Sequence, residues 1–452
     1  MYMIPDDDYD TSIKHAMLHA DLSQIYDMSK EKRNLILPYE DRQKIIRDKK
    51  RAERAQLNSA DGDTGEFHDQ FYRDHKLLLV LFRALAVMPI TRSSPGRVTF
   101  SWKSLATIYA IFFYIGMTVV VFYVGRERIR ILGETKRFDE KIYAYIFVIF
   151  LVPHFWIPFV GWGVAKEVAV YKTMWASFQV RYYRVTGRNL VFPRLKMLLY
   201  FISIGCLLCA LLFLMSLSAL LEGFLLWHTS AYFHIITMIN MNCALWYINC
   251  RGIKEASKSL SNTFKEDLNE DINAFIISQY RYLWLNLSEL LQALGNAYAR
   301  TYSTYCLFMF VNITIAVYGA VSEIFDHGFR FSFKEMGLLV DATYCSILLF
   351  VFCDCSHKST LTVAQGVQDT LLSVNLFNVD LPTQKEIDLF IQAIEMNPAV
   401  VSLKGYADVN RELLSSSIAT ITIYLIVLLQ FKLSLVTQQL PTSLQAHIAA
   451  HS

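Results

Sequence analysis

Seven stretches of about 20 mostly apolar residues constrain the fold of this chain more than any other feature. A helix needs about 20 such residues to cross the hydrocarbon core of a bilayer. The stretches are residues 105–124, 143–165, 197–221, 225–247, 302–321, 336–353 and 418–436. They predict an all-α integral membrane protein with seven transmembrane helices. The fourth is the weakest candidate, because polar residues interrupt it: His228, His234, Asn240 and Asn242.

Composition supports a membrane protein and argues against nucleic-acid binding. Hydrophobic residues make up 54% of the 452 positions and charged residues 18%, whereas soluble domains carry about 25% charged residues. The formal net charge of +3 is small, and the basic residues are spread over several loops. We therefore expect membrane lipid and no nucleic acid among the partners.

The distribution of Lys and Arg predicts the orientation, because these residues collect on the cytoplasmic side. With the N-terminus inside, the inner segment 166–196 contains one acid, Glu167, and seven basic residues: Lys166, Lys172, Arg181, Arg184, Arg188, Arg194 and Lys196. The first outer loop, 125–142, is an exception with six basic residues. The balance favours a cytoplasmic N-terminus and, for seven helices, an extracellular C-terminus.

This topology predicts the following organisation. Residues 1–66 form a poorly ordered cytoplasmic tail, and 67–104 a pre-membrane helical segment. Residues 105–353 contain helices one to six, with a long cytoplasmic extension at 251–301. Cytoplasmic anchor helices occupy 354–417, with a break near Asn397-Pro398, and the last transmembrane helix occupies 418–436. An extracellular tail, 437–452, ends the chain.

Motifs separate three functional classes: a membrane enzyme, a transporter, and a receptor or channel. No HExxH, paired-Asp or GxSxG motif occurs, so we expect no enzyme and no catalytic residues. Cys353-Asp354-Cys355 lacks a second Cys or His cluster, so we expect neither a metal site nor a cofactor. Only the second stretch is interrupted by Pro and Gly, whereas transporters repeat such breaks in two halves. A receptor or channel fits best.

The last stretch carries the most specific signal. It contains Tyr424, five apolar residues and then Gln430-Phe431. This resembles the signature of the insect gustatory receptor family, Thr-Tyr followed by five hydrophobic residues and Gln-Phe. The sequence departs from it by Ile423 in place of the Thr, with Thr422 one step earlier. Two further segments, 67–76 and 92–102, are similar to the carbon dioxide receptor subfamily.

The resemblance implies a ligand-gated, non-selective cation channel of four subunits around one pore, in the plasma membrane of chemosensory neurons. It implies that the last helix of each subunit lines the pore and that helices four to seven anchor the subunits at their cytoplasmic ends. It further implies that related gustatory receptor subunits join this chain in a homo- or heterotetramer that detects carbon dioxide or another small molecule.

Helical spacing places Ile423, Val427 and Gln430 on one face of the last helix. A ring of Val427 side chains can gate a pore by dewetting, and a ring of Gln430 amides offers polar contacts to permeating cations. The alternative is a hydrogen bond from Gln430 to a neighbouring helix. Tyr424 and Phe431 fall partly off this face and are expected to pack against adjoining helices.

The outer halves of helices two to six contain the candidate ligand-binding residues, any of which can instead serve packing alone: Tyr145, His228, Tyr232, His234, Tyr318, Asp341 and Tyr344. Tyr and neutral His suit a small neutral ligand such as carbon dioxide, whereas bicarbonate requires Arg or Lys, and none is expected there. A metabotropic receptor and a secondary transporter remain the alternatives from other classes.

Overall fold

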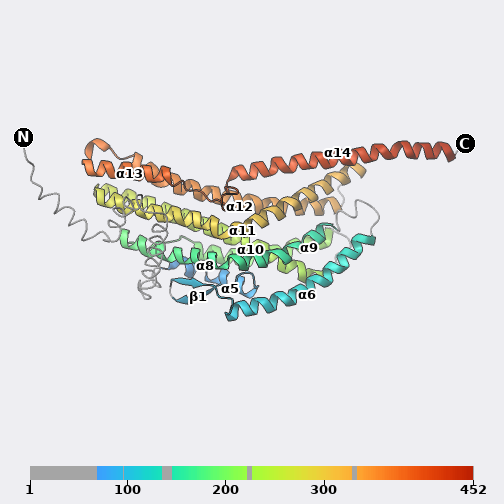
Figure 1. Ribbon diagram of the computed structural model, residues 1–452, viewed down its shortest axis with the longest axis horizontal. Helices are drawn as coiled ribbons and strands as arrows, with labels where there is room; N and C mark the ends of the chain where they lie inside the picture. The colour runs from blue at the N-terminus through green and yellow to red at the C-terminus, as the bar shows by residue number, and fades with distance from the viewer. Residues whose placement is uncertain (1–68, 95, 135–144, 221–225, 328–332, 451–452) are drawn as a thin grey trace, which may run out of the picture.

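The computed structural model describes residues 69–94, 96–134, 145–220, 226–327 and 333–450. The predicted tail, 1–66, lies outside these ranges. The long helices run roughly along one axis (Figure 1), with α6 and α14 on opposite sides of the molecule. The elements are α5 (Gln70–Ala84), β1 (Thr91–Ser94), β2 (Arg97–Thr99), α6 (Leu105–Glu134), α8 (Val152–Thr186), α9 (Leu195–Leu220), η1 (Leu226–His228), α10 (Thr229–Glu270), α11 (Ala274–His327), α12 (Phe333–Leu372), η2 (Leu376–Asn378), α13 (Leu381–Met396) and α14 (Arg411–Ala450).

Within the described ranges, six helices are long and apolar enough to cross a membrane, and each overlaps one of the predicted stretches: Leu105–Glu134, Tyr145–Thr186, Leu195–Ala219, Ala274–Phe325, Glu335–Leu372 and Arg411–Ser434. The remaining predicted stretch, 225–247, lies mainly in α10. This helix is long enough to cross a membrane but has too low a mean hydropathy to be included among the six. α10 nevertheless packs between α9 and α12 and also contacts α11. The structure therefore supports several membrane-spanning helices.

Buried amides and a buried indole connect α10 to its neighbours. Asn242 donates from Nδ2 to the Tyr305 hydroxyl at 2.8 Å, and its backbone carbonyl accepts from the Tyr302 hydroxyl at 2.5 Å. Trp246 Nε1 donates to the carbonyl oxygen of Phe352 at 3.1 Å. Because buried polar groups cost free energy unless they are paired, these bonds explain how a polar helix is accommodated inside the bundle.

The Pro-rich second stretch is broken near its start. A first helical segment begins at Tyr145 and gives way to a turn at Phe150 and Leu151, and α8 then starts at Val152 with Pro153 in its first turn. Proline is tolerated there because the first backbone N–H groups of a helix have no partner within the helix. α8 then continues past the predicted end of the span, to Thr186.

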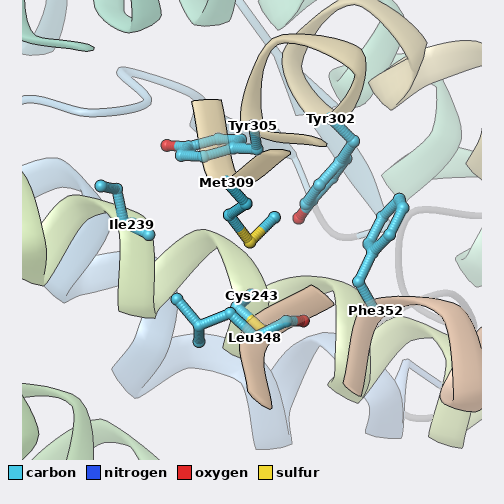
Figure 2. A pocket seen from close by; sticks show the side chains of 7 residues that line it. All are labelled: Ile239, Cys243, Tyr302, Tyr305, Met309, Leu348 and Phe352. Carbon is cyan, nitrogen blue, oxygen red and sulfur yellow. The ribbon is translucent and has the colours of Figure 1, made fainter. Parts of the chain in front are cut away.

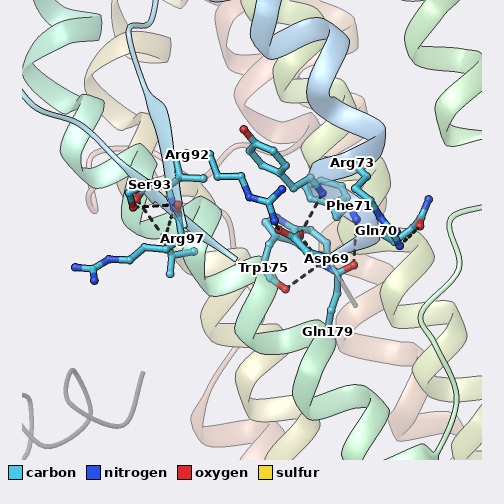
Figure 3. Close-up of polar contacts among 12 residues, drawn as sticks. Asp69, Gln70, Phe71, Arg73, Arg92, Ser93, Arg97, Trp175 and Gln179 are labelled. Atoms are coloured by element: carbon cyan, nitrogen blue, oxygen red, sulfur yellow. Dashed lines mark hydrogen bonds and ion pairs between the residues drawn. The ribbon is translucent and has the colours of Figure 1, made fainter. Parts of the chain in front are cut away.

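α5 packs on α8 and α9, and the β1–β2 hairpin packs on α8; together they form what we call the cap, the described residues 69–94 and 96–99 (Figure 3). Gln179 connects α8 to the start of α5: its Oε1 accepts from the Phe71 N–H at 3.1 Å, and its Nε2 donates to Asp69 at 3.3 Å. Asp69 also caps α5. The ring of Phe71 stacks on Trp175 with centroids 3.9 Å apart. Burial of the Asp69 carboxyl raises its pKa.

The end of the molecule at the left of Figure 1 is built from α13 and from the neighbouring ends of α10, α11 and α12. α13 ends at Met396, at the predicted break, and Arg281 of α11 forms an ion pair with Glu386 at 2.6 Å. The segment between α13 and α14 lies so close to α11 that a Cβ on Gly295 would stand 2.4 Å from the Ser402 carbonyl oxygen. Glycine is required at this contact.

Candidate functional site

α14 differs from every other apolar helix in how little of it is covered. Only 6% of the residues in its most apolar window are buried, the lowest share of the six. A narrow stripe that includes Ile421 and Leu425 packs against α11 and α12, and the rest of the circumference is bare. A helix so apolar and so little covered by its own chain requires lipid or another subunit around it.

Polar contacts hold α14 to the bundle at two points. Near its start, Arg411 donates from Nε and Nη2 to Asp354 Oδ1 of α12 at 3.0 and 2.6 Å. Further along the helix, Lys432 Nζ donates to the Ser322 carbonyl at 2.9 Å and to the Ser322 hydroxyl at 2.5 Å, on α11. The helix is thus fixed to the bundle by polar contacts while its apolar face stays open.

The three predicted pore residues lie on the bare side of α14. Ile423 is 62% exposed and Val427 39% exposed, and Gln430 is also exposed. The Tyr424 ring contacts Phe310 of α11 edge-on, with centroids 6.1 Å apart, and Phe431 is 65% exposed. The exposed position of these three side chains is compatible with pore lining, which stays a prediction.

His228 and Tyr232 lie in one buried polar cluster at the junction of α6, η1 and α10. Arg128 of α6 donates to His228 Nδ1 at 2.8 Å, and His228 Nε2 lies 3.1 Å from the Glu127 carboxylate. Arginine can only donate, so His228 accepts at Nδ1 and donates from Nε2. Tyr232 donates to the Phe147 carbonyl at 2.9 Å, and the Arg128 guanidinium lies 4.4 Å from the centre of the Phe147 ring.

Asp341 and Tyr344 lie one turn apart on α12, in a second cluster. Asp341 is buried and accepts from Asn312 Nδ2 at 3.2 Å. The Tyr344 hydroxyl donates to Asn240 Oδ1 at 2.7 Å, and its ring stacks on Phe213 with centroids 4.3 Å apart. Tyr344 also borders an open apolar groove of about 390 Å³ along α12.

The remaining candidates lie apart from these clusters. His234 is buried with its Nε2 3.1 Å from the Leu85 carbonyl, and its ring is 6.2 Å from that of His154. Tyr145 is 49% exposed, and Tyr318 of α11 is partly buried. The candidates are therefore distributed over several sites, and their role in binding stays a prediction.

One basic residue, Arg128 of α6, lies against the predicted ligand-binding residues. This residue is 3% exposed beside two predicted ligand residues. The sequence assigned it to an outer loop, but α6 continues ten residues past the predicted end of the span, from Val124 to Glu134, and carries Arg128 into the bundle. The unbroken helical run without Pro from Phe122 to Leu132 was the available signal.

A small cavity of about 10 Å³ lies among α10, α11 and α12 (Figure 2). Its walls are Ile239, Cys243, Tyr302, Tyr305, Met309, Leu348 and Phe352. This volume holds about one water-sized molecule. The two tyrosine hydroxyls are engaged by Asn242, so the walls are mainly apolar. None of the predicted ligand residues lines it.

The architecture defines a class: a helical, multi-pass membrane protein whose last apolar helix is held at two points and otherwise uncovered. Comparison with known proteins then gives the family. The family described as 7tm chemosensory receptor matches residues 75–435. The chain belongs to this family of chemosensory receptors, which is not a family of enzymes.

Curated relatives narrow the family to insects. The chain is 44% identical over 377 residues to gustatory and odorant receptor 22 of Anopheles gambiae, covering 82% of this chain and 80% of the relative. It is 40% identical over 373 residues to gustatory and odorant receptor 21a of Drosophila melanogaster, covering 81% and 82%. The prediction of an insect gustatory receptor is confirmed.

Solved structures support the fold. The chain resembles the insect olfactory receptor OR5 from Machilis hrabei with a TM-score of 0.53 and 12% identity, covering 78% of this chain and 97% of that one. The complex of the same receptor with eugenol gives a TM-score of 0.52. At this identity the likeness concerns the fold alone.

Proposed function

We propose that this chain is one subunit of a tetrameric, ligand-gated, non-selective cation channel in the plasma membrane of chemosensory neurons. The single observation that carries the proposal is α14: apolar, tied to its bundle by Arg411 and Lys432, and 6% buried in its most apolar window. A helix that only anchored the chain in lipid would have no need of Gln430 on its bare face.

In this proposal the bare faces of four α14 helices meet around one axis. Ile423 and Val427 form apolar rings that exclude water when narrow, and Gln430 offers amide groups to cations. The neighbouring subunits cover the remaining apolar side chains, including Phe431. The cytoplasmic ends of α10 to α13 supply the contacts between subunits.

The proposed topology has seven spans, with α10 as the fourth. Its polar side chains face protein rather than lipid, which makes an otherwise costly span tolerable. The N-terminus is cytoplasmic and the C-terminus extracellular, in agreement with the basic residues of segment 166–196. A gustatory receptor with this topology is a channel rather than a metabotropic receptor, because the latter requires an outside N-terminus.

We propose carbon dioxide as the ligand, detected together with related subunits. The support is the resemblance of segments 67–76 and 92–102 to the carbon dioxide branch, and the described parts of both belong to the cap or directly follow it. Arg128 favours a second candidate, bicarbonate, because a buried guanidinium beside His228 suits a small anion. Another small molecule is the remaining alternative within the family.

The test is whole-cell current from cells expressing this chain alone and with a related subunit. Carbon dioxide pulses are compared with buffers matched for pH and for bicarbonate. We expect a fast cation current with carbon dioxide only, and altered permeability in Gln430→Ala. A current that follows bicarbonate at constant carbon dioxide selects the second candidate. Saturable uptake without current, or a tag at residue 1 that is accessible on intact cells, contradicts the channel proposal.

A further inference from the structure

A buried lysine lies beneath the cap, away from every site described above. Lys172 of α8 is 6% exposed, and its Nζ donates to Asn249 Oδ1 of α10 at 2.9 Å. The amine lies 5.2 Å from the centre of the Phe71 ring and 5.6 Å from that of Tyr171. In the part of the chain that the structure describes, no ion pair joins Lys172 to a carboxylate.

This setting favours the neutral amine. Burial penalises an ammonium ion, and Asn249 is a neutral amide that compensates only in part. The nearby carboxylate of Asp69 is engaged by Gln179, by the Tyr72 N–H and by Arg92. A desolvated, neutral lysine is a nucleophile.

A proton acceptor lies beside it. His75 of α5 is 1% exposed and has its Nδ1 3.0 Å from the Phe71 carbonyl oxygen. A carbonyl only accepts, so Nδ1 carries the proton and Nε2 presents a lone pair. Nε2 is buried and has no hydrogen-bond partner. Burial lowers the pKa of His75 well below its ordinary value, so the imidazole is neutral.

A second buried polar atom lacks a partner nearby. The hydroxyl of Tyr298, on α11, is fully buried without a hydrogen bond, and its ring centroid lies 5.9 Å from that of Tyr171. A phenol can donate to an anion. The group around Lys172 thus holds a nucleophile, an unused base and a buried phenol, which an entirely structural lysine does not require.

We propose that Lys172 is a reversible carbamylation site for carbon dioxide, with His75 as the base. This inference rests on the proposed carbon dioxide response. The neutral amine attacks the carbon of carbon dioxide: the N–C bond forms, one C–O π bond opens, and the proton lost from Nζ goes to Nε2 of His75. No electrons are transferred, and the pair that results, carbamate and imidazolium, is neutral overall.

The adduct has a structural consequence at the cap. A carbamate anion replaces the neutral amine that faces Phe71 and weakens its bond to Asn249, so the contacts that join α5, α8 and α10 change together. It also stabilises the imidazolium of His75, because an anion has replaced a neutral group beside it. Carbon dioxide binding is thereby coupled to the position of α5.

The experiment uses the full-length channel in lipid nanodiscs, equilibrated with ¹³C-labelled carbon dioxide at constant pH. Carbamates are trapped by O-alkylation with a trialkyloxonium salt and located by peptide mass spectrometry. We expect label on Lys172 and none on Lys258, whose side chain is 51% exposed and serves as the matched lysine. We also expect loss of the label in Lys172→Arg, which keeps a charge and donors but no nucleophile.

Two readouts separate this inference from the proposed function. His75→Gln removes the base without touching the lysine and is expected to lower both labelling and current, which keeps the test available if Lys172→Arg misfolds. An unlabelled Lys172 in wild-type channels that carbon dioxide opens overturns the carbamylation site and leaves the function standing. Label on Lys172 in channels that carbon dioxide does not open supports the site and removes the ligand assignment.

Discussion

α10, the more polar of two helices, is largely buried, whereas α14, the more apolar, is largely exposed. The mean hydropathy of α10 is too low for a typical membrane span, yet the helix contains polar side chains that are almost fully buried: Asn242, Trp246 and Asn249. The mean hydropathy of α14 is high enough for a membrane span, yet three of its large side chains are more than half exposed: Ile423, Tyr424 and Phe431. In lipid, apolar side chains gain little by leaving the surface, whereas polar groups gain partners inside the protein. Burial therefore identifies the structural helix, and exposed apolar surface is the feature on which we propose that α14 meets other subunits.

The comparison is tested most strongly at Trp246, the buried indole between Tyr302 and Phe352. Trp246→Ala leaves a cavity and removes the bond from the indole to the Phe352 carbonyl, so we expect a loss of about 3–5 kcal/mol in stability. The measurement is the melting temperature of the solubilised protein. Ile423→Ala on α14 is the control and should change stability by less than about 0.5 kcal/mol. Equal losses would show that α14 is as structural as α10.

A glycine on α10 gives a smaller effect. A Cβ on Gly252 would stand 2.4 Å from Phe71 Cε2, and Phe71 is held by its stack on Trp175. Gly252→Ala should therefore displace α5 at a cost of about 1–3 kcal/mol. Gly163→Ala is the matched control, because nothing lies within 4 Å of its added Cβ. Hydrogen exchange of residues 70–84 measures the displacement, and unchanged exchange would contradict it.

The weakest expected effect concerns the contact of Lys432 on α14 with Ser322 on α11, which we call the tie. Ser322→Ala removes the hydroxyl that accepts from Lys432 and leaves the carbonyl contact, a change of about 0.5–1.5 kcal/mol. Because this tie holds α14 against α11, we expect easier opening and a lower half-activating ligand concentration. Dose–response currents measure it, with the exposed Ser434→Ala as control. A higher half-activating concentration would show that the tie stabilises the open state.

Much of the helical fold follows from the sequence, because apolar stretches of sufficient length are an unambiguous signal. All seven stretches fall largely within helices, and the break after Met396 was predicted from Asn397-Pro398. The packing of the cap was not predictable. Its central bonds join Phe71 and Asp69 to Gln179, more than a hundred residues away, and no local pattern encodes such a pair.

The candidate site could be predicted only in part for the same reason. The helical period of α14 predicted that Ile423, Val427 and Gln430 share one face, and all three are exposed. The ligand candidates were chosen by depth in the membrane alone, and depth does not tell which helices are neighbours. Arg128 was missed because the end of α6 was placed ten residues too early.

Cysteine accessibility along α14 tests the central claim most directly. Val427→Cys and Ile421→Cys are compared in open channels treated with a positively charged methanethiosulfonate reagent, with the wild type as background for the exposed Cys209. Val427 lies on the bare face and Ile421 is 6% exposed against the bundle. We predict block of the current in Val427→Cys and none in Ile421→Cys. Block at Ile421→Cys with Val427→Cys unaffected would contradict a pore lined by the bare face of α14.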